Sequence, residues 1–206
     1  MADDLLKKLN NKIADSYKTL PLLDTKEDFV PGEGTASASI LMIGEAPGYH
    51  ETVERRPFVG KSGKLLRQVI DEVGLDIKDI YISNIVKARP PENRDPSPAE
   101  IKSFKPFLDE EIRIVDPKLI VTLGRFSMNK FLPDVKISEV HGKLQRIEWD
   151  YHVKFVLPMY HPAAALRGTK VKNIFIDDFR KIKKIISWLE KTASRNLELD
   201  VKEALF

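Results

Sequence analysis

The sequence predicts an α/β fold in which helices cover a mostly parallel sheet. Short continuous apolar runs, typical of strands buried on both faces, recur along the chain. Between them lie segments in which apolar residues recur at helical spacing, and strands that alternate with helices favour this fold class. Three of the predicted strands are followed by informative loops, which suggests where a site would form.

The first half of the chain alternates helix and strand. Apolar residues at helical spacing predict a first helix, which Pro21 should end, and Gly74 should end the second. The loop between them is predicted because its glycines and prolines are too frequent for a helix. The predicted elements are a helix over Asp3–Leu20, a strand over Ile40–Ile43, a long loop over Gly44–Ser62, a helix over Gly63–Val73 and a strand over Asp79–Val86.

The second half continues this alternation. Ser97, Pro98 and Glu100 form a capping box with proline at the first helical position, which marks the start of a helix, and Gly124 should open another. We expect a single domain over residues 1–192 and a polar tail over 193–206. The predicted elements are a proline-rich loop over Lys87–Ser97, a helix over Pro98–Val115, strands over Leu119–Leu123, Leu144–Ile147 and Val153–Leu157, a loop over Pro158–Pro162 and an amphipathic helix over Asn173–Lys191.

Composition and charge narrow the functional classes. The 206 residues are 42% hydrophobic and 32% charged, a globular balance that allows a sizeable core. The 34 basic and 31 acidic residues give a net charge of +3, which alone does not indicate a nucleic-acid partner. The absence of cysteine excludes disulfides, cysteine nucleophiles and thiolate metal sites. No signal peptide or membrane-spanning run is visible, so we expect a soluble, intracellular protein.

The loops that begin at Gly44, Lys87 and Pro158 each follow a predicted strand. Because ligands bind outside the carboxyl ends of parallel strands, we expect these loops to meet at one edge of the sheet and form a site. Basic residues are frequent in them, which would suit phosphate binding, although an ordinary solvated surface has the same appearance in sequence. These residues are Arg55, Arg56, Lys61, Lys64, Arg67, Lys87, Arg89, Arg94, Arg167, Lys170 and Lys172.

Individual loop residues leave alternatives open. The stretch before Gly63 superficially resembles a phosphate-binding loop, but Phe58 and Leu65 stand where that pattern needs glycine and Ser or Thr. Asn84 is either a satisfied structural residue or an amide that reads one edge of a nucleobase. His161 is either structural or, because its loop follows a strand, part of the site. The other three histidines lack metal-ligand spacing, so no metal site is predicted.

Six motifs then occur in a fixed order between about residues 10 and 190. They are Val30–Gly34, Gly44–Gly48, Pro57–Leu66, Asn84–Arg94, Thr122–Arg125 and His161–Arg167. In order and spacing, the set resembles the uracil-DNA glycosylase superfamily, and most closely its family four, the iron–sulfur branch. The resemblance implies a three-layer α/β/α sandwich and a base-excision repair enzyme that removes uracil from DNA after flipping it out of the stack.

The same resemblance implies roles for residues on the base side of the site. Phe58 would stack on the uracil, and Asn84 would bind its Watson–Crick edge and so discriminate it from cytosine. His161 would donate a hydrogen bond to uracil O2, where negative charge develops as the base leaves. Backbone groups of the first motif would also approach the base. The implied uracil-binding set is Gly44, Ala46, Phe58 and Asn84.

The sugar side needs a carboxylate, because cleavage of the glycosidic bond develops an oxocarbenium ion. Ala46 stands where some relatives have aspartate, so Glu45 and Glu51 are the candidates; Glu51 is also placed to exclude thymine, and the choice stays open. No lysine is placed as a Schiff-base nucleophile, so we expect a monofunctional enzyme that leaves an abasic site. The implied DNA-binding set is Lys61, Ser62, Arg89, Asn93, Arg94, Arg125, Leu166 and Arg167, of which the last two would press into the duplex.

The chain departs from family four at several positions. That branch binds a four-iron cluster through four cysteines, so with none in this chain we expect no cofactor and a small packed apolar cluster instead. Acidic residues are common in the family where this chain has Tyr49 and His50, and glycine where it has Arg55, which puts substrate preference and rate in question. The four positions hold Tyr17, Leu20, Ala88 and Phe104.

Two other functions remain open. A glycosylase sibling could prefer another base, such as hypoxanthine or a mismatched thymine. A catalytically silent DNA-binding module is the second alternative, and His161 argues against it. For the enzyme we expect uracil-containing DNA as the partner, no membrane association, a monomeric state, and a cytoplasmic location with the nucleoid.

Overall fold

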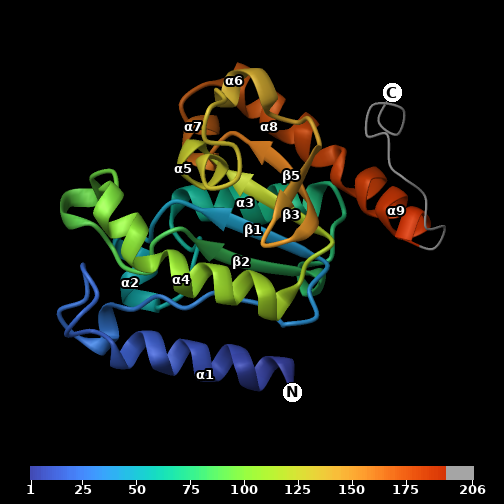
Figure 1. The fold of residues 1–206 in the computed structure, drawn as a ribbon. Coiled ribbons are helices and arrows are strands. Elements are labelled where there is room, and N and C mark those ends of the chain that lie inside the picture. Colours follow the sequence, from blue (N-terminus) through green and yellow to red (C-terminus); the bar gives the residue numbers. More distant parts are fainter. Residues whose placement is uncertain (194–206) are drawn as a thin grey trace.

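A five-stranded sheet forms the middle layer of the computed structural model, which describes residues 1–193 (Figure 1). The strand order is β2-β1-β3-β5-β4. The first four strands in this order are parallel, and β4 pairs with β5 in the antiparallel direction. The strands are β1 (Ile40–Gly44), β2 (Ile80–Asn84), β3 (Leu119–Leu123), β4 (Gln145–Trp149) and β5 (His152–Met159).

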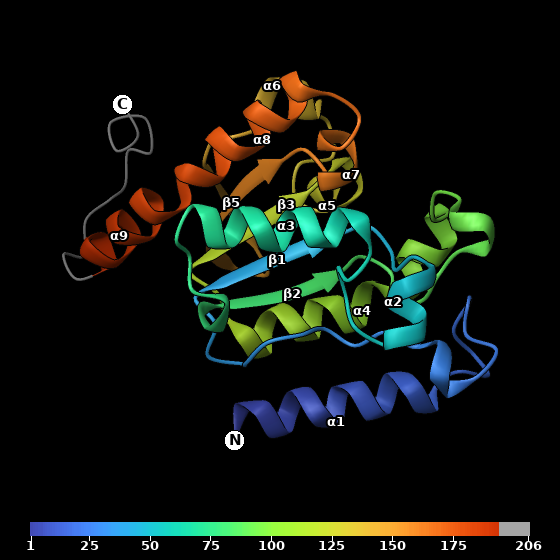
Figure 2. The ribbon, with the colours of Figure 1, turned by 180° about the vertical axis from the view of Figure 1, so that it is seen from behind.

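Alternate strand residues point to opposite faces of the sheet, and each face has its own apolar core. On one face, Ile40 and Met42 of β1 pack in a core with α3 (Lys61–Glu72), α8 (Thr169–Arg180) and α9 (Ile182–Ala193). On the other, Leu41 and Ile43 pack with α1 (Ala2–Asp15) and α4 (Pro98–Val115). Figures 1 and 2 show these two helical layers from opposite sides of the molecule. The predicted three-layer sandwich with a mostly parallel sheet is confirmed.

Several local predictions were wrong at their boundaries. The first helix ends at Asp15, and β5 includes Pro158 and Met159, the first two residues of the predicted loop. The predicted long C-terminal helix is divided at Lys181, whose amide donates to the carbonyl of Asp178, three residues back instead of four. The predicted loop before α3 contains the helix α2 (Tyr49–Glu54), and α6 (Ile137–Val140) was also not predicted.

The capping box predicted before α4 is present: the Ser97 hydroxyl accepts from the Glu100 amide, and the Glu100 carboxylate accepts from the Ser97 amide.

The remaining short elements connect the layers. The short elements are α5 (Arg125–Asn129), α7 (Pro162–Ala165) and the 3₁₀ helices Lys26–Asp28, Ile77–Asp79 and Pro91–Asn93.

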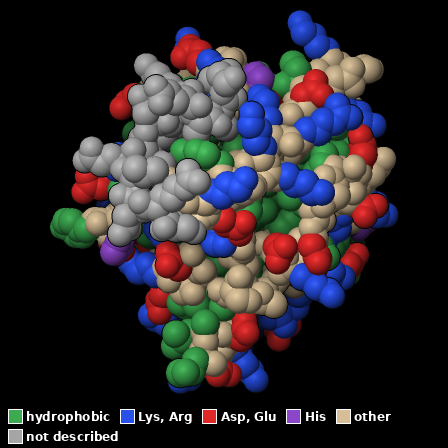
Figure 3. All heavy atoms as spheres, turned by 90° about the vertical axis from the view of Figure 1, so that its right-hand side faces the viewer, with side chains coloured by type: hydrophobic (Ala, Val, Ile, Leu, Met, Phe, Trp, Pro, Cys, Tyr) green, Lys and Arg blue, Asp and Glu red, His purple; other side chains and the backbone are tan. Residues whose placement is uncertain are grey.

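The loops that carry the candidate residues lie together at one end of the sheet. The carboxyl ends of β1, β2 and β5 lead into the three loops in which the sequence places its candidate residues. The view onto the other end shows basic, acidic and apolar side chains intermingled (Figure 3). Of the predicted tail, only Ala193 lies within the described residues, as the last residue of α9. None of the described helices has the length and apolar character needed to cross a membrane.

Candidate active site

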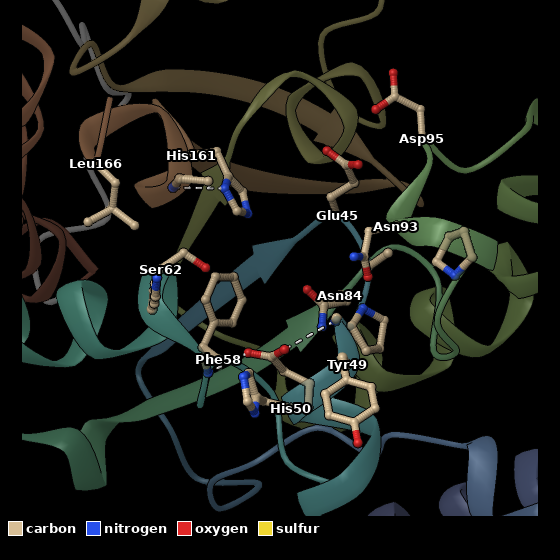
Figure 4. Close-up of a pocket in the computed structure, with 18 of the residues that line it drawn as sticks. Glu45, Tyr49, His50, Phe58, Ser62, Asn84, Asn93, Asp95, His161 and Leu166 are labelled. Carbon is tan, nitrogen blue, oxygen red and sulfur yellow. Dashed lines mark hydrogen bonds between the residues drawn. The ribbon is translucent and has the colours of Figure 1, made fainter. Parts of the chain in front are cut away.

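A pocket of about 750 Å³ opens at the carboxyl ends of the strands. Its lining draws on the loop after β1, the start of α3, the end of β2, the proline-rich loop and the segment after β5 (Figure 4). The predicted convergence of loops at one edge of the sheet is therefore correct. The predicted site residues that line the pocket are Glu45, Ala46, Glu51, Phe58, Lys61, Ser62, Asn84, Asn93, Arg94, His161, Leu166 and Arg167.

Gly44 has no side chain, and the ring of Phe58 and the amide of Asn84 fill the space beside it. A Cβ at Gly44 would lie 2.4 Å from Asn84 Oδ1 and 2.5 Å from the ring of Phe58, so only glycine fits between these side chains. The backbone of Phe58 has φ +54°, a left-handed conformation that is strained for a bulky residue. Its carbonyl accepts a hydrogen bond from Arg67 Nε at 3.1 Å, which helps to hold the loop. The loop thus places the ring of Phe58 at the pocket.

Asn84 carries an unused hydrogen-bond acceptor at the pocket. Its side chain is 4% exposed, and Oδ1 has no hydrogen-bond partner among the described residues. Thr122 Oγ1 is the other buried side-chain atom in residues 1–193 that lacks a partner, and Thr122 does not line the pocket. Because buried polar groups in folded proteins are nearly always satisfied, an orphaned amide oxygen at a pocket indicates a ligand that donates to it.

His161 precedes α7 and caps it. Its Nδ1 accepts a hydrogen bond from the Ala163 amide at 3.1 Å, so the ring proton of the neutral form resides on Nε2. Burial, together with the positive charge of Arg167, lowers the pKa of His161 to about 4. The ring lies on the pocket with its centroid 5.9 Å from that of Phe58 (Figure 4). His161 is therefore a neutral hydrogen-bond donor near pH 7.

The two candidate carboxylates have different surroundings. Both oxygens of Glu51 accept backbone hydrogen bonds, Oε1 from the amides of Val59 and Gly60 at 3.0 and 2.7 Å, and Oε2 from the amide of Gly48 at 3.2 Å. These contacts tie the two ends of the first loop together. Glu45 lies on the pocket, and burial, followed by the nearby charge of Asp95, raises its pKa. The environment of Glu45 is that of a partly desolvated acid or base, whereas Glu51 holds the loop.

Lys87 was expected among the basic residues that surround the site, and this expectation is wrong. Its side chain is 1% exposed and turns into the protein, where Nζ lies 2.5 Å from Glu111 Oε2 and also contacts Ser83. Glu111 additionally accepts from Tyr81 at 3.0 Å and from Ser83 at 2.7 Å. Lys87 therefore joins the proline-rich loop to β2 and α4, and none of its charge reaches the surface. A charged residue in a loop gives no sign in sequence that its partner lies 24 positions away.

Several other predicted DNA-binding residues pair with groups of this chain. Arg94 binds both oxygens of Glu100, at 2.8 and 2.6 Å, and this guanidinium lowers the pKa of Glu100 to about 2. Arg89 donates to Asn93 at 2.8 Å, and Arg125 pairs with Asp95. Neither Arg89 nor Arg125 lines the pocket.

Other predicted contacts at the pocket mouth are free to meet a ligand. Lys61 and Arg167 line the pocket, and their side chains make no ion pair within the described residues. Leu166, beside them, is 51% exposed although it is apolar. An exposed apolar residue that lines the same pocket as two basic residues suits a surface that pushes into a DNA helix.

The positions that correspond to the iron–sulfur ligands form part of one apolar core. Ala88 and Phe104 are fully buried in it, and Tyr17 and Leu20 pack against it, beside α1 and α4. The four side chains offer no thiolate, and the whole chain has no cysteine. In residues 1–193 there is also no group of three or more His, Cys, Asp or Glu residues that could hold a metal ion. The residues present do not fit an iron–sulfur cluster.

Comparison with known proteins agrees with this geometry. The family model described as "Uracil DNA glycosylase superfamily" matches residues 31–189. The chain is 43% identical over 190 residues to a type-4 uracil-DNA glycosylase of Sulfurisphaera tokodaii, covering 88% of this chain and 85% of the relative. It is 41% identical over 173 residues to the type-4 uracil-DNA glycosylase of Archaeoglobus fulgidus, covering 81% of this chain and 86% of the relative. It is 37% identical over 168 residues to the type-4 uracil-DNA glycosylase of Thermotoga maritima, covering 81% of this chain and 87% of the relative. The chain therefore belongs to the uracil-DNA glycosylase superfamily.

Proposed function

We propose that this protein is a monofunctional uracil-DNA glycosylase of base-excision repair. It hydrolyses the bond between a flipped-out uracil and its deoxyribose and leaves an abasic site. The observation that carries the proposal is the orphaned acceptor of Asn84, which lies on the pocket beside the ring of Phe58. The names of the type-4 relatives support the same activity.

The base side of the pocket matches the edge of uracil. With uracil stacked on Phe58, Asn84 Oδ1 accepts from N3–H and the amide nitrogen donates to O4. Cytosine has an acceptor at N3 and a donor at C4, so the same amide orientation would face it with two mismatched contacts. In this amide orientation, Asn84 selects uracil over cytosine.

The leaving group is stabilised by a neutral histidine. As the C1′–N1 bond breaks, its electron pair leaves with uracil, and negative charge gathers on O2. Nε2–H of His161 donates to O2, a contribution of about 3 kcal/mol to the transition state for a preorganised donor of this kind. The low pKa of His161 matters because a neutral ring retains its Nδ1 contact with Ala163 and so its orientation.

On the sugar side, Glu45 is the carboxylate that the surroundings favour. It stabilises the oxocarbenium ion and accepts a proton from the water whose oxygen bonds to C1′. Glu51 is assigned to holding the loop, because both of its oxygens already accept backbone hydrogen bonds. The arginines that pair with this chain's own carboxylates reach phosphate only by exchanging partners, so Lys61 and Arg167 make the first contacts with DNA.

We further propose that the enzyme works without an iron–sulfur cluster, as a monomer acting on cytoplasmic DNA. Packing of Phe104 and Ala88 in the core beside α1 and α4 supports an apolar cluster in place of the iron. Metal analysis and a visible absorption spectrum of the purified protein should show no iron. Stoichiometric bound iron would contradict this part of the proposal and leave the activity assignment intact.

Single-turnover excision on uracil-containing oligonucleotides tests the activity. Substrates are single-stranded or paired with G or A, and hypoxanthine and mismatched thymine run beside uracil. We expect abasic product from uracil, lost in Asn84→Ala and strongly reduced in His161→Ala. Tyr151→Ala is the matched control, because Tyr151 is exposed on the turn between β4 and β5, at the other end of the sheet. Product from another base alone would favour the sibling enzyme, and binding without any product would favour the silent module.

A further inference from the structure

An exposed aromatic ring stands at the rim of the pocket. Tyr49, the first residue of α2, lines the pocket and is 59% exposed, so its ring is open to a ligand at the site. Figure 4 shows it across the pocket from Leu166. Nothing in the chemistry proposed for excision uses this ring.

The ring is held in place by neighbours that leave a large part of it open. The guanidinium of Arg89 lies 5.4 Å from the ring centroid, and the ring of His50 meets it edge-on at 5.5 Å. Arg89 is itself oriented by the bond from its Nε to Asn93 Oδ1 at 2.8 Å. The ring of Tyr49, the guanidinium of Arg89 and the side chain of Asn93 together form a stacking surface, which we call the Tyr49 platform.

We propose that the Tyr49 platform stacks an unpaired base next to the flipped-out uracil, so that the enzyme holds single-stranded DNA at its pocket. The inference rests on the proposed function. Every base has a π-face, so an aromatic ring beside a cation binds single strands with little sequence preference. The base that stacks on Tyr49 must have left its own neighbours, which an unpaired strand allows readily and a duplex resists. The positive charge of Arg89 also suits the phosphate beside that base.

Binding measurements with the Tyr49 variants test the platform directly. The probe is a fluorescently labelled single-stranded oligonucleotide, with and without one uracil, and its duplex. Tyr49→Ala should weaken binding of the single strand by roughly tenfold, the loss typical of one stacked base, and change duplex binding much less. Tyr49→Phe keeps the ring and should bind the single strand as tightly as the wild type does. Tyr151→Ala, an exposed tyrosine on the β4–β5 turn, should match the wild type.

A change on the DNA side identifies the contact. In a second single-stranded oligonucleotide, the bases on both sides of the uracil are replaced by abasic analogues, so no flanking base can stack. The wild type should then bind as weakly as Tyr49→Ala, and the two substitutions together should add little. In excision, the Tyr49→Ala effect should appear in KM and not in kcat. An undiminished Tyr49→Ala effect on the oligonucleotide without flanking bases, or equal losses on single strand and duplex, would overturn the proposal.

The same experiments distinguish failure of the Tyr49 platform from failure of the proposed function. If the wild type releases no uracil, the uracil-free oligonucleotide still reports whether Tyr49 stacks a base, because that arm measures binding alone. If uracil is released but single-strand binding is the same in Tyr49→Ala and the wild type, the platform is wrong and the glycosylase assignment stands.

Discussion

Lowering the pH should reduce the free energy of unfolding, because the surroundings of His161 in the folded protein lower the pKa of its ring. In the folded protein its pKa lies at about 4, against 6.5 for an ordinary histidine. Above the unfolded pKa both states are neutral and stability is complete. Between pH 6.5 and about pH 4, the unfolded chain binds a proton at His161 that the folded chain does not, so the free energy of unfolding falls as the pH falls. The shift of about 2.5 units corresponds to a loss of about 3 kcal/mol.

His161→Asn is the perturbation that isolates this effect. Asparagine can still accept from the Ala163 amide, as a good N-cap does, but it does not titrate. Urea unfolding at about pH 7.5 and about pH 4 gives the free energy of unfolding of each protein. The wild type should lose about 3 kcal/mol more than His161→Asn over this interval, because all other titrating groups are common to both.

Parallel loss of stability in the two proteins would refute this reasoning. It would mean that the folded environment leaves the His161 pKa near its unfolded value. The NMR titration of the His161 ring gives the same quantity independently, with an expected midpoint at about 4. A low midpoint also predicts that the excision rate shows no His161 titration near neutral pH.

Three further experiments test a buried ion pair, the loop at the site and the core beside α1 and α4. Lys87→Met should cost roughly 3–5 kcal/mol in chemical unfolding, because it leaves Glu111 buried and uncompensated. Adding Glu111→Gln removes the unpaired charge and keeps an acceptor for the hydroxyls of Tyr81 and Ser83, so the double variant should recover part of that loss. Equal losses in the single and double variants would contradict the buried pair. Glu51→Gln should lower stability by about 2 kcal/mol, since its charged bonds to three amides become weaker, and an unchanged thermal midpoint would argue against the loop-holding role. Phe104→Ala should cost about 3–5 kcal/mol as a core cavity, with Tyr151→Ala as the near-neutral comparison.

The sequence predicted the sheet well because buried parallel strands are nearly uniform apolar runs. The strand predicted over Ile40–Ile43 differs from β1 by Gly44 alone, and the strand over Leu119–Leu123 coincides with β3. The convergence of the loops followed from the geometry of parallel sheets, without any contact having to be known. By contrast, α2 lies in a stretch whose glycines and prolines argued against a helix, since the short helix needs only the residues between Gly48 and Arg55.

Charge was harder to place than hydrophobicity. Lys87 and Lys61 have the same character in sequence, but Lys87 is fully buried against Glu111 and Lys61 lies on the pocket. Their difference depends on partners brought in by other elements. The sequence also could not choose between Glu45 and Glu51, because the choice depends on which carboxylate meets the backbone amides of Val59 and Gly60. Partner choice is a tertiary property that residue type and spacing do not encode.

The pocket has a consequence for how activity returns when the chain refolds. Gly44, Asn84 and His161 belong to or follow β1, β2 and β5, and β3 separates β1 from β5 in the sheet. Parallel pairing joins segments that are distant along the chain, and such contacts form slowly. A chain in which β5 has not yet docked can have most of its helices and yet no complete pocket. Recovery of base excision after dilution from denaturant thus reports completion of the sheet, later than the recovery of helical signal.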